Sequence, residues 1–454
     1  MQRTNLRRCL RGLAVAVSVL VMSSSVVGQS FRRGGAQFEA VRSVALGTEA
    51  RNARVIVVEF WHHGLISPKG DNVVVAAGSD FVPTRVLQLG PGDFCRLAFQ
   101  ANGSSSYEIL YGGDPLPEGA LPKWTAEVGL LLETREYRDC NLNNLDSIRQ
   151  AFNQATPIGA DFVDGVAHAG NIFEYRPGGY FSRYSGTLYI ESAGTYGFLT
   201  TSQDASFLLI DGKLVVAAPG RHRPERWAKP GMRKDIQLTA GPHTFEYYHV
   251  ATTQEGMAVA AWEVNPKAAK PAPVAIPKEV FRAHLVARGT VGRPALAKQS
   301  LVPDFRIKIL CDVPLPDNPT PLVGVQFYDN SPTGLLAGGK VTWDFGDGQT
   351  SSELTPMHVY LKPGLYTVRE TIRRAGRDFE IVNRVYVHPP RLGNIRLVEA
   401  RSVVASPTGR GILVQGGSIP ASAEAERGRS DARSRGSFPE GRNARTKSGT
   451  RGKS

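Results

Sequence analysis

Residues 202–216 read Ser-Gln-Asp-Ala-Ser-Phe-Leu-Leu-Ile-Asp-Gly-Lys-Leu-Val-Val, and this stretch decides how the middle of the chain folds. An apolar run, Phe207–Ile210, is followed by Asp211-Gly212 and then by a second run, Lys213–Val216. Asp-Gly readily adopts the positive φ angles of a type I′ turn, and the flanking runs fit two partly buried strands. The stretch therefore predicts a β-hairpin.

Strand and turn signals of the same kind continue through most of the 454 residues. The 48 glycines and 30 prolines favour turn-rich β architecture over helical bundles, and a hydrophobic content of 41% suffices for several cores. One helix is expected at residues 144–154, where Leu145, Ile148 and Phe152 fall on one face. The sequence thus predicts an all-β, multi-domain protein built from β-sandwiches, with one short helix.

The N-terminal end has the composition of a secretory signal. Four arginines precede the apolar stretch Leu13–Met22, which is too short to span a bilayer and leads into small residues that end at Gly28. We therefore expect residues 1–28 to be a signal peptide and the protein to be exported, whether secreted, periplasmic or on the cell surface. No transmembrane segment is expected once the signal is removed.

The positive charge lies mainly at the two ends of the chain. Of the formal net charge of +13, residues 1–28 contribute +4 and residues 417–454, with nine Lys or Arg against four Asp or Glu, contribute +5, which leaves +4 for residues 29–416. A body that binds nucleic acid would concentrate basic residues on one element, so a nucleic-acid partner is disfavoured. Residues 417–454 predict a disordered basic tail, which either contacts an acidic surface or is merely solvated.

A set of motifs in the middle of the chain shares its order and spacing with a known family. The motifs are Tyr-Ser-Gly-Thr-Leu-Tyr-Ile at 184–190, Gly-Thr-Tyr-Gly-Phe at 194–198, the stretch at 202–213, Leu-Thr-Ala-Gly-Pro-His at 238–243 and Ala-Trp-Glu at 261–263. On these motifs, residues 126–265 resemble the protective-antigen ("PA-fourteen") β-sandwich of bacterial surface proteins, toxins, glycosidases and fungal adhesins. Asp211 and Gly212 are expected to be structural members of the motif.

A second family resemblance rests on motifs near the end of the body. They are Val-Thr-Trp-Asp-Phe-Gly-Asp-Gly at 341–348, His-Val-Tyr at 358–360 and Lys-Pro-Gly-Leu-Tyr-Thr-Val at 362–368. Residues 303–388 therefore resemble a polycystic kidney disease (PKD) domain, an immunoglobulin-like sandwich. Trp343 is expected to point inward, and Asp344 and Asp347 to hydrogen-bond their own turn, with a calcium role as the alternative.

The remaining parts of the body resemble no family. Residues 31–120 contain five strand-like runs separated by Gly, Pro and Asp clusters, which predicts a small N-terminal β-sandwich. Residues 266–302 begin with a Pro-, Ala- and Lys-rich stretch that is typical of a linker. Cys95 and Cys140 either form one disulfide or, with Cys311, are buried thiols.

The resemblance to the protective-antigen family points to a ligand site at Gln203-Asp204. Carbohydrate-binding members of that family hold calcium between two adjacent aspartates joined by a cis peptide bond, and the calcium binds sugar hydroxyls. Gln203 replaces one of these carboxylates by a neutral amide, which weakens the case for calcium because calcium affinity rises with ligand charge. Asp204 is therefore either a metal and sugar ligand or a residue that stabilises its turn.

A basic loop follows in the same region. Residues 220–235 carry Arg223, Arg226 and Trp227 among further basic side chains. Guanidinium groups beside an indole ring suit an anionic glycan, through charge-assisted hydrogen bonds and ring stacking. The alternative is a solvated loop whose Trp227 packs on its own sandwich.

Signatures of catalysis are missing from the sequence. It contains no Gly-x-Ser-x-Gly, no His-Glu-x-x-His and no Cys-x-x-Cys. We therefore predict a non-catalytic surface or envelope module that binds polysaccharide or a surface protein and needs no cofactor, calcium aside. A structural component of envelope or matrix assembly is one alternative. An accessory part of a carbohydrate-active enzyme system, with carboxylates that pair only in space, is another.

Overall fold

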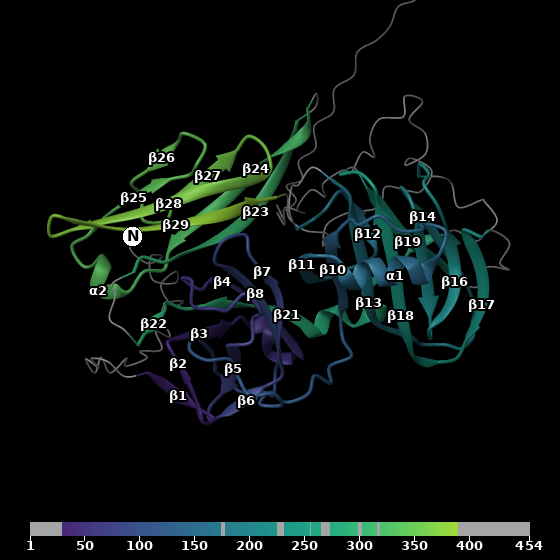
Figure 1. The fold of residues 1–454 in the computed structure, drawn as a ribbon, viewed down its shortest axis with the longest axis horizontal. Helices are drawn as coiled ribbons and strands as arrows, with labels where there is room; N and C mark the ends of the chain where they lie inside the picture. Colours follow the sequence, from purple (N-terminus) through teal and green to yellow (C-terminus); the bar gives the residue numbers. More distant parts are fainter. Residues whose placement is uncertain are drawn as a thin grey trace, which may run out of the picture. The chain divides into compact units, whose positions relative to one another are not determined.

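The computed structural model describes residues 30–173, 178–224, 231–254, 256–264, 273–297, 302–315 and 318–388. Strands dominate these residues, as Figure 1 shows, and the predicted all-β fold class is confirmed. The predicted signal peptide and basic tail lie outside the described residues. Within the described ranges, no helix is long and apolar enough to cross a membrane.

The N-terminal module is built around one sheet whose two halves enclose a common core. Its strands are β1 (Phe31–Arg33), β2 (Ala36–Phe38), β3 (Ala40–Leu46), β4 (Val55–Trp61), β5 (Val73–Ala77), β6 (Asp80–Val82), β7 (Thr84–Leu89), β8 (Phe94–Gln100) and β9 (Tyr107–Tyr111), with a 3₁₀ turn, η1 (Thr48–Asn52). Strands β1 and β2 form a separate two-stranded sheet, and the other strands join β21 (Val286–Val291) in the order β6-β5-β9-β3-β21-β4-β8-β7. The rings of Phe99 and Tyr107, from opposite halves, lie 4.8 Å apart, so the halves pack face to face.

The strand that joins these halves comes from the stretch predicted as a linker. Strand β21 (Val286–Val291) pairs antiparallel with β3 and parallel with β4, and β22 (Ala295–Leu296) also pairs with β3. Between β20 (Val274–Ala275) and β21 lie two 3₁₀ turns, η2 (Lys278–Phe281) and η3 (Ala283–Leu285). The prediction of a linker over 266–302 therefore has to be corrected, because the described part, 273–297, completes two folded modules.

The central module is a sandwich of two antiparallel sheets. Its strands are β10 (Leu130–Glu136), β11 (Pro157–Val163), β12 (Ala167–Ala169), β13 (Tyr180–Ile190), β14 (Gly194–Ser202), β15 (Ser206–Ile210), β16 (Lys213–Ala218), β17 (Arg233–Leu238), β18 (Gly241–Ala251) and β19 (Met257–Val264). One sheet has the order β11-β10-β13-β18-β15-β16 and the other β12-β19-β14-β17, with β20 beside β19.

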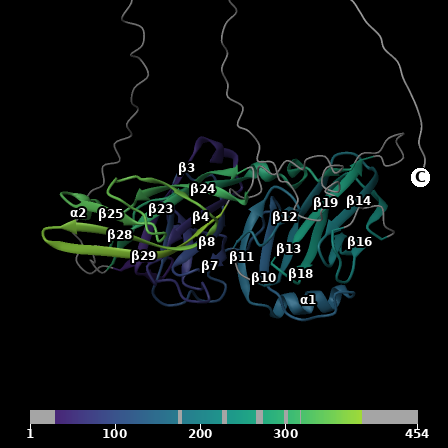
Figure 2. The same cartoon turned by 90° about the horizontal axis from the view of Figure 1, so that it is seen from above.

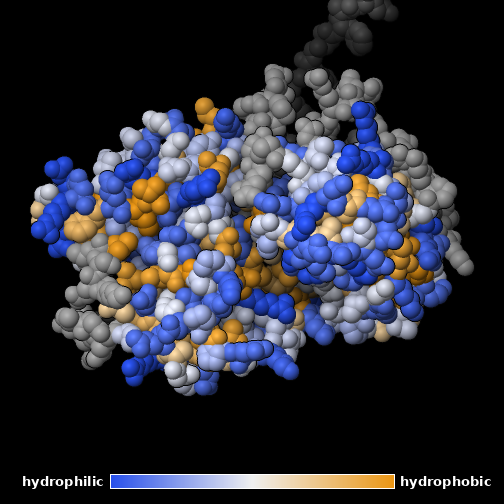
Figure 3. Space-filling model, viewed as in Figure 1, coloured by the Kyte–Doolittle hydropathy of each residue, from blue (hydrophilic) through white to orange (hydrophobic). Residues whose placement is uncertain are grey.

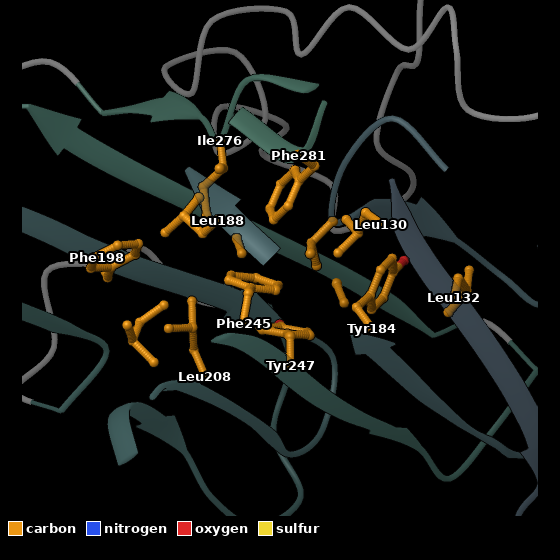
Figure 4. Packing of buried hydrophobic residues seen from close by; sticks show 14 of the residues in the cluster. Leu130, Leu132, Tyr184, Leu188, Phe198, Leu208, Phe245, Tyr247, Ile276 and Phe281 are labelled. Carbon is orange, nitrogen blue, oxygen red and sulfur yellow. The ribbon is translucent and has the colours of Figure 1, made fainter. Parts of the chain in front are cut away.

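The core between the two central sheets is rich in aromatic side chains. Figure 4 shows Tyr184, Phe245 and Tyr247 of the first sheet and Phe198 of the second among leucines of the first sheet, and all four aromatic side chains are at most 1% exposed. Phe281, from η2, closes this core and places its ring 5.1 Å from that of Phe245. A short polar turn could not supply this contact, which explains why a linker-like stretch carries a phenylalanine.

Helix α1 (Leu145–Gln154) covers the outer face of the first sheet, where Figures 1 and 2 both place it over β13 and β18. The Asn144 side chain caps its first turn by accepting a hydrogen bond from the Ser147 N–H at 2.8 Å. Ile148 and Phe152 are fully buried on the sheet side. The predicted helix is thus found where the periodicity placed it.

The predicted hairpin is formed by β15 and β16. Asp211 and Gly212 have φ angles of 50° and 70°, as a type I′ turn requires. The Asp211 carboxylate accepts a hydrogen bond from the Thr244 N–H at 2.9 Å and lies 2.7 Å from His243 Nδ1. The turn is therefore tied to the neighbouring strand, β18.

The C-terminal module is a second sandwich. It comprises β23 (Phe305–Leu315), β24 (Asn318–Asp329), α2 (Thr333–Leu336), β25 (Lys340–Asp344), β26 (Thr350–Ser351), β27 (Met357–Tyr360), β28 (Gly364–Arg374) and β29 (Arg377–Val387). Its sheets have the orders β23-β24-β27 and β26-β25-β28-β29. Trp343 is fully buried between them, with its ring centre 5.4 Å from that of Phe305 in an edge-to-face contact and 5.6 Å from that of Phe327 in a tilted one.

The surface of the described part is mostly polar. Hydrophilic residues cover most of the face drawn in Figure 3, with hydrophobic residues in smaller groups between them. Cys95 is buried, Cys140 is partly buried and Cys311 is exposed, and all three are free thiols. The alternative of a Cys95–Cys140 disulfide is therefore not what the structure contains.

Candidate functional site

Asp204 lies in the turn between β14 and β15 and is a point where three segments meet. Its backbone is in the left-handed region, with φ of 61°, and the residue is 6% exposed. Its Oδ2 accepts hydrogen bonds from the Thr252 N–H at 2.8 Å and the Thr252 hydroxyl at 2.7 Å, while its Oδ1 accepts one from the His222 N–H at 3.2 Å. The carboxylate therefore fastens two loops to the turn.

The backbone around Asp204 is held equally firmly. The Asp204 N–H donates to the His222 carbonyl at 2.8 Å, and the Ser202 hydroxyl donates to the Asp204 carbonyl at 2.7 Å. His249 Nε2 lies 2.9 Å from the Gln203 carbonyl, and burial lowers the pKa of His249 to about 4. The neutral imidazole thus donates its Nε2–H to that carbonyl.

This arrangement does not fit the calcium site of the family. The Gln203–Asp204 peptide bond is trans, and both Asp204 carboxylate oxygens already accept protein hydrogen bonds. Among the described residues, no group of three or more His, Cys, Asp or Glu side chains could hold a metal ion. The donors around Asp204 instead match a residue that stabilises its turn and the loops beside it.

The loop fastened by Asp204 is the basic loop of the sequence prediction. Residues 220–224 and 231–235 of this loop are described, and Arg221 and Arg223 in the first part are exposed. Gly220 N–H donates to the Leu142 carbonyl at 3.0 Å, and the His222 ring nitrogens lie 3.0 and 3.3 Å from the carbonyl oxygens of Arg223 and Ala218. The loop is therefore held to the sandwich at several points while its arginines face solvent.

The predicted site residues are only partly brought together. Asp204 accepts a hydrogen bond from the N–H of His222, and Arg223 directly follows His222. The predicted site residues Asp204 and Arg223 therefore lie in the same site. Arg226 and Trp227 lie outside the described residues. Asp344 and Asp347 belong to the C-terminal module, and Asp211 lies in the β15–β16 turn.

The aspartates of the C-terminal motif bind their own turn. Asp344 Oδ1 accepts from the Gly346 N–H at 2.9 Å, and Asp347 Oδ1 accepts from the Gln349 N–H at 3.1 Å. The second oxygen of Asp347 lies 2.8 Å from His358 Nε2. These contacts give both carboxylates a structural role in the turn.

Sequence reasoning missed a buried ion pair between the N-terminal and C-terminal modules. The guanidinium of Arg42, on β3, lies 2.7 and 3.0 Å from the two oxygens of Asp304, and both side chains are 1% exposed. Burial opposes both charges, yet their mutual attraction outweighs it, raising the pKa of Arg42 and lowering that of Asp304. The two residues lie 262 positions apart, so no local pattern could have revealed the pair.

A second charged group lies between the N-terminal and central modules. Arg96, on β8, is 2.7 Å from Glu59 and 3.5 Å from Asp161, and Arg288, on β21, is 2.8 Å from Asp161. Asp161, on β11, is fully buried. The N-terminal module thus makes buried ionic contacts with both neighbouring modules.

Comparisons with known proteins identify one domain by its sequence and several structures with a similar fold. The family model of the PKD domain matches residues 330–381. Similar solved structures include a PA14 sugar-binding domain from an RTX adhesin, at 15% identity over 34% of this chain and 97% of that one, with a TM-score of 0.28. A second is the epithelial adhesin 9 A domain of Candida glabrata in complex with Galb1-4GlcNAc, at 13% identity over 30% and 81% of the two chains, with a TM-score of 0.24.

A third similar structure spans more of the chain. It is an anti-sigma factor domain-containing protein from Clostridium clariflavum, at 14% identity over 58% of this chain and 100% of that one, with a TM-score of 0.25. No curated protein matches the chain by sequence. On its motifs, its two sandwiches and the match at 330–381, the chain resembles proteins in which a protective-antigen-type β-sandwich is followed by a PKD domain.

Proposed function

We propose that the chain is an exported, non-catalytic binding module for polysaccharide, and that the loop after β16 is its contact surface. The observation that carries this proposal is the Asp204 carboxylate, which fastens the loop through His222 while leaving Arg221 and Arg223 exposed. A loop fixed before binding loses little conformational entropy when a ligand arrives. The arrangement supports recognition by a rigid surface.

The chemistry of the loop favours acidic polysaccharides over neutral ones. The Arg223 side chain makes no hydrogen bond or ion pair within the described part of the chain, and the Arg221 side chain makes one hydrogen bond, to the Tyr137 hydroxyl. Guanidinium groups form short, charge-assisted hydrogen bonds to carboxylates and sulfates. Arg226 and Trp227 continue the same loop in sequence and are assigned to the same contact.

In this proposal Asp204 acts through the loop and does not touch the ligand. It is nearly buried and its oxygens are occupied, so its role is to position the arginines. No calcium is needed for such binding. The PKD domain then serves as a spacer or as a second contact.

The test is retention of the full chain on immobilised polygalacturonate, with amylose as the neutral comparison. The double variant Arg221→Gln/Arg223→Gln is expected to elute at clearly lower salt than the parent. The control Lys213→Gln/Lys340→Gln removes the same charge from exposed strand positions and is expected to elute with the parent. Equal elution of both double variants, or release of shortened sugars during incubation, would contradict the proposal.

A second candidate, protein binding, is favoured by the outer side of β27. This strand is at the edge of its sheet, and Met357 and Val359 are 63% and 40% exposed, with Leu361 directly after the strand 69% exposed. An edge strand with exposed apolar side chains is a ready surface for another chain. Concentration-dependent self-association that Met357→Lys abolishes would favour this function over the first.

A further inference from the structure

A polar pocket lies where the N-terminal and central modules adjoin the return segment 273–297. Its volume is about 330 Å³, within the range of small-ligand sites. The polar side chains that line it are Arg54, Gln100, Thr125, Glu127, Tyr189 and Arg282. None of these residues belongs to the loop of the proposed function.

The walls of the pocket are fixed by hydrogen bonds of the protein itself. The Arg54 N–H donates to the Leu285 carbonyl at 2.7 Å. The Gln100 amide makes two hydrogen bonds to Thr125, at 2.5 and 3.1 Å, and the Tyr189 hydroxyl donates to the Glu127 carbonyl at 3.2 Å. The pocket is therefore formed before any ligand enters.

Two guanidinium groups in the pocket keep their hydrogen-bonding capacity. The Arg282 guanidinium carbon lies 3.4 Å from the centre of the Tyr189 ring, and the Arg282 backbone is held at φ of 53°. Within the described ranges, the side chains of Arg54 and Arg282 make no hydrogen bond or ion pair, although each guanidinium offers five N–H donors. Both side chains are exposed, so these donors are open to a ligand that enters the pocket.

The third charged group of the pocket limits what that ligand can be. The Glu127 carboxylate has no partner in the described part of the chain, and it would repel a compact anion such as sulfate. A sugar acid satisfies all three groups, because its carboxylate accepts from Arg54 and Arg282 and its hydroxyls donate to Glu127. A neutral sugar would leave both arginines without an anion.

We propose that this pocket binds a single uronic acid residue, so that the chain has a second, selective site for acidic polysaccharide. The inference shares the ligand class of the proposed function but uses a separate site. The basic loop would attract any polyanion, whereas the pocket would select the sugar acid. Failure of one site therefore leaves the other intact and measurable.

The test is calorimetric titration of the full chain with trigalacturonic acid, which is short enough to report on the pocket. Arg54→Gln and Arg282→Asn are each expected to weaken binding about tenfold or more, since each removes a charged hydrogen-bond donor. Asparagine is chosen at 282 because it tolerates the left-handed backbone. Arg51→Gln, an exposed arginine outside the pocket, and Lys213→Gln/Lys340→Gln are expected to bind like the parent.

Competing ligands distinguish a site for a sugar acid from a site for a neutral sugar, a compact anion or a small carboxylate. Maltotriose, sodium sulfate and glycine are expected to compete poorly, and Glu127→Gln is expected to lower the ratio of trigalacturonate to sulfate affinity. Unchanged binding by Arg54→Gln would overturn the proposal, as would competition by sulfate or glycine equal to that of trigalacturonate. Thermal melting of each variant checks that it is folded. If Arg282→Asn does not fold, the binding of Arg54→Gln alone decides the test.

Discussion

Asp204 Oδ2 accepts both the backbone N–H and the hydroxyl hydrogen of Thr252, at 2.8 and 2.7 Å. The same carboxylate reaches the His222 N–H with its other oxygen. The resemblance to the protective-antigen family predicts a calcium and sugar ligand at Asp204, whereas in the structure this carboxylate joins two loops to its turn. The chain thus keeps the aspartate of the motif and uses it to hold the neighbouring basic loop.

Removing this carboxylate should loosen the central module. Asp204→Ala loses three hydrogen bonds to a buried charge and leaves a β-carbon residue at positive φ, so we expect the free energy of unfolding to fall by about 3 kcal/mol. Asp204→Asn, which tolerates positive φ and keeps one acceptor oxygen, should cost about 1–2 kcal/mol. Urea unfolding measures both, and equal losses would argue against the role of the charge.

The turn at Asp211-Gly212 should be sensitive to backbone conformation alone. A β-carbon added at Gly212 would meet no atom within 4 Å, so Gly212→Ala carries only the strain of φ at 70°, about 1 kcal/mol. Gly212→Asn should cost less, because asparagine adopts this conformation more readily. Thermal melting compares the two, and a larger loss in the asparagine variant would contradict the type I′ assignment.

The buried pair of Arg42 and Asp304 should make the N-terminal and C-terminal modules depend on each other. Asp304→Ala leaves the Arg42 charge buried without its partner, which should cost about 3–5 kcal/mol. Adding Arg42→Met removes that stranded charge and should restore part of the loss. Denaturant unfolding of the two single variants and the double variant completes the cycle, and strictly additive losses would show that the pair does not interact.

Stability of the central module should fall as the pH is lowered toward 4. Burial lowers the pKa of His249 from about 6.5 to about 4, and burial beside His249 lowers that of His168 as well. Between these values the unfolded chain binds more protons than the folded one, so stability is fully present above pH 6.5 and is lost as the pH falls. For His249 alone the loss is on the order of 3 kcal/mol.

The variant His249→Asn provides the matched measurement. Its melting temperature should be lower than that of the parent at pH 7, because the bond to the Gln203 carbonyl is weakened. Between pH 7 and pH 4, however, the melting temperature of the variant should fall less than that of the parent. An equal pH dependence in both proteins would mean that other groups set the acid sensitivity.

Local patterns predicted the parts of the fold that are encoded over a few residues. Asp211-Gly212 between two apolar runs identified the hairpin, and the spacing of Leu145, Ile148 and Phe152 identified the helix. The positions of Asp344 and Asp347 in their turn followed in the same way. Each of these features is stabilised within its own segment, so the sequence of that segment suffices.

Features that depend on distant contacts could not be predicted in this way. Residues 273–297 looked like a linker, yet Phe281 fills the central core and Val286–Val291 joins the two halves of the N-terminal sheet. The pocket brings Arg54 and Arg282 together from segments more than two hundred residues apart. Their chemistry arises from the fold and is invisible in either segment alone.

The central claim, that the Asp204-held loop binds acidic polysaccharide, is tested most directly in the Arg54→Gln background, where the pocket is expected to contribute little. We would measure the affinity of this protein for polygalacturonate across a salt series, with calcium and then with a chelator, before and after adding Arg221→Gln/Arg223→Gln. The account predicts an affinity for polygalacturonate that the chelator does not change and that falls as salt is added. Removing both loop arginines should lower this affinity about tenfold or more. Binding that vanishes with the chelator, or that survives the loss of both arginines unchanged, would contradict it.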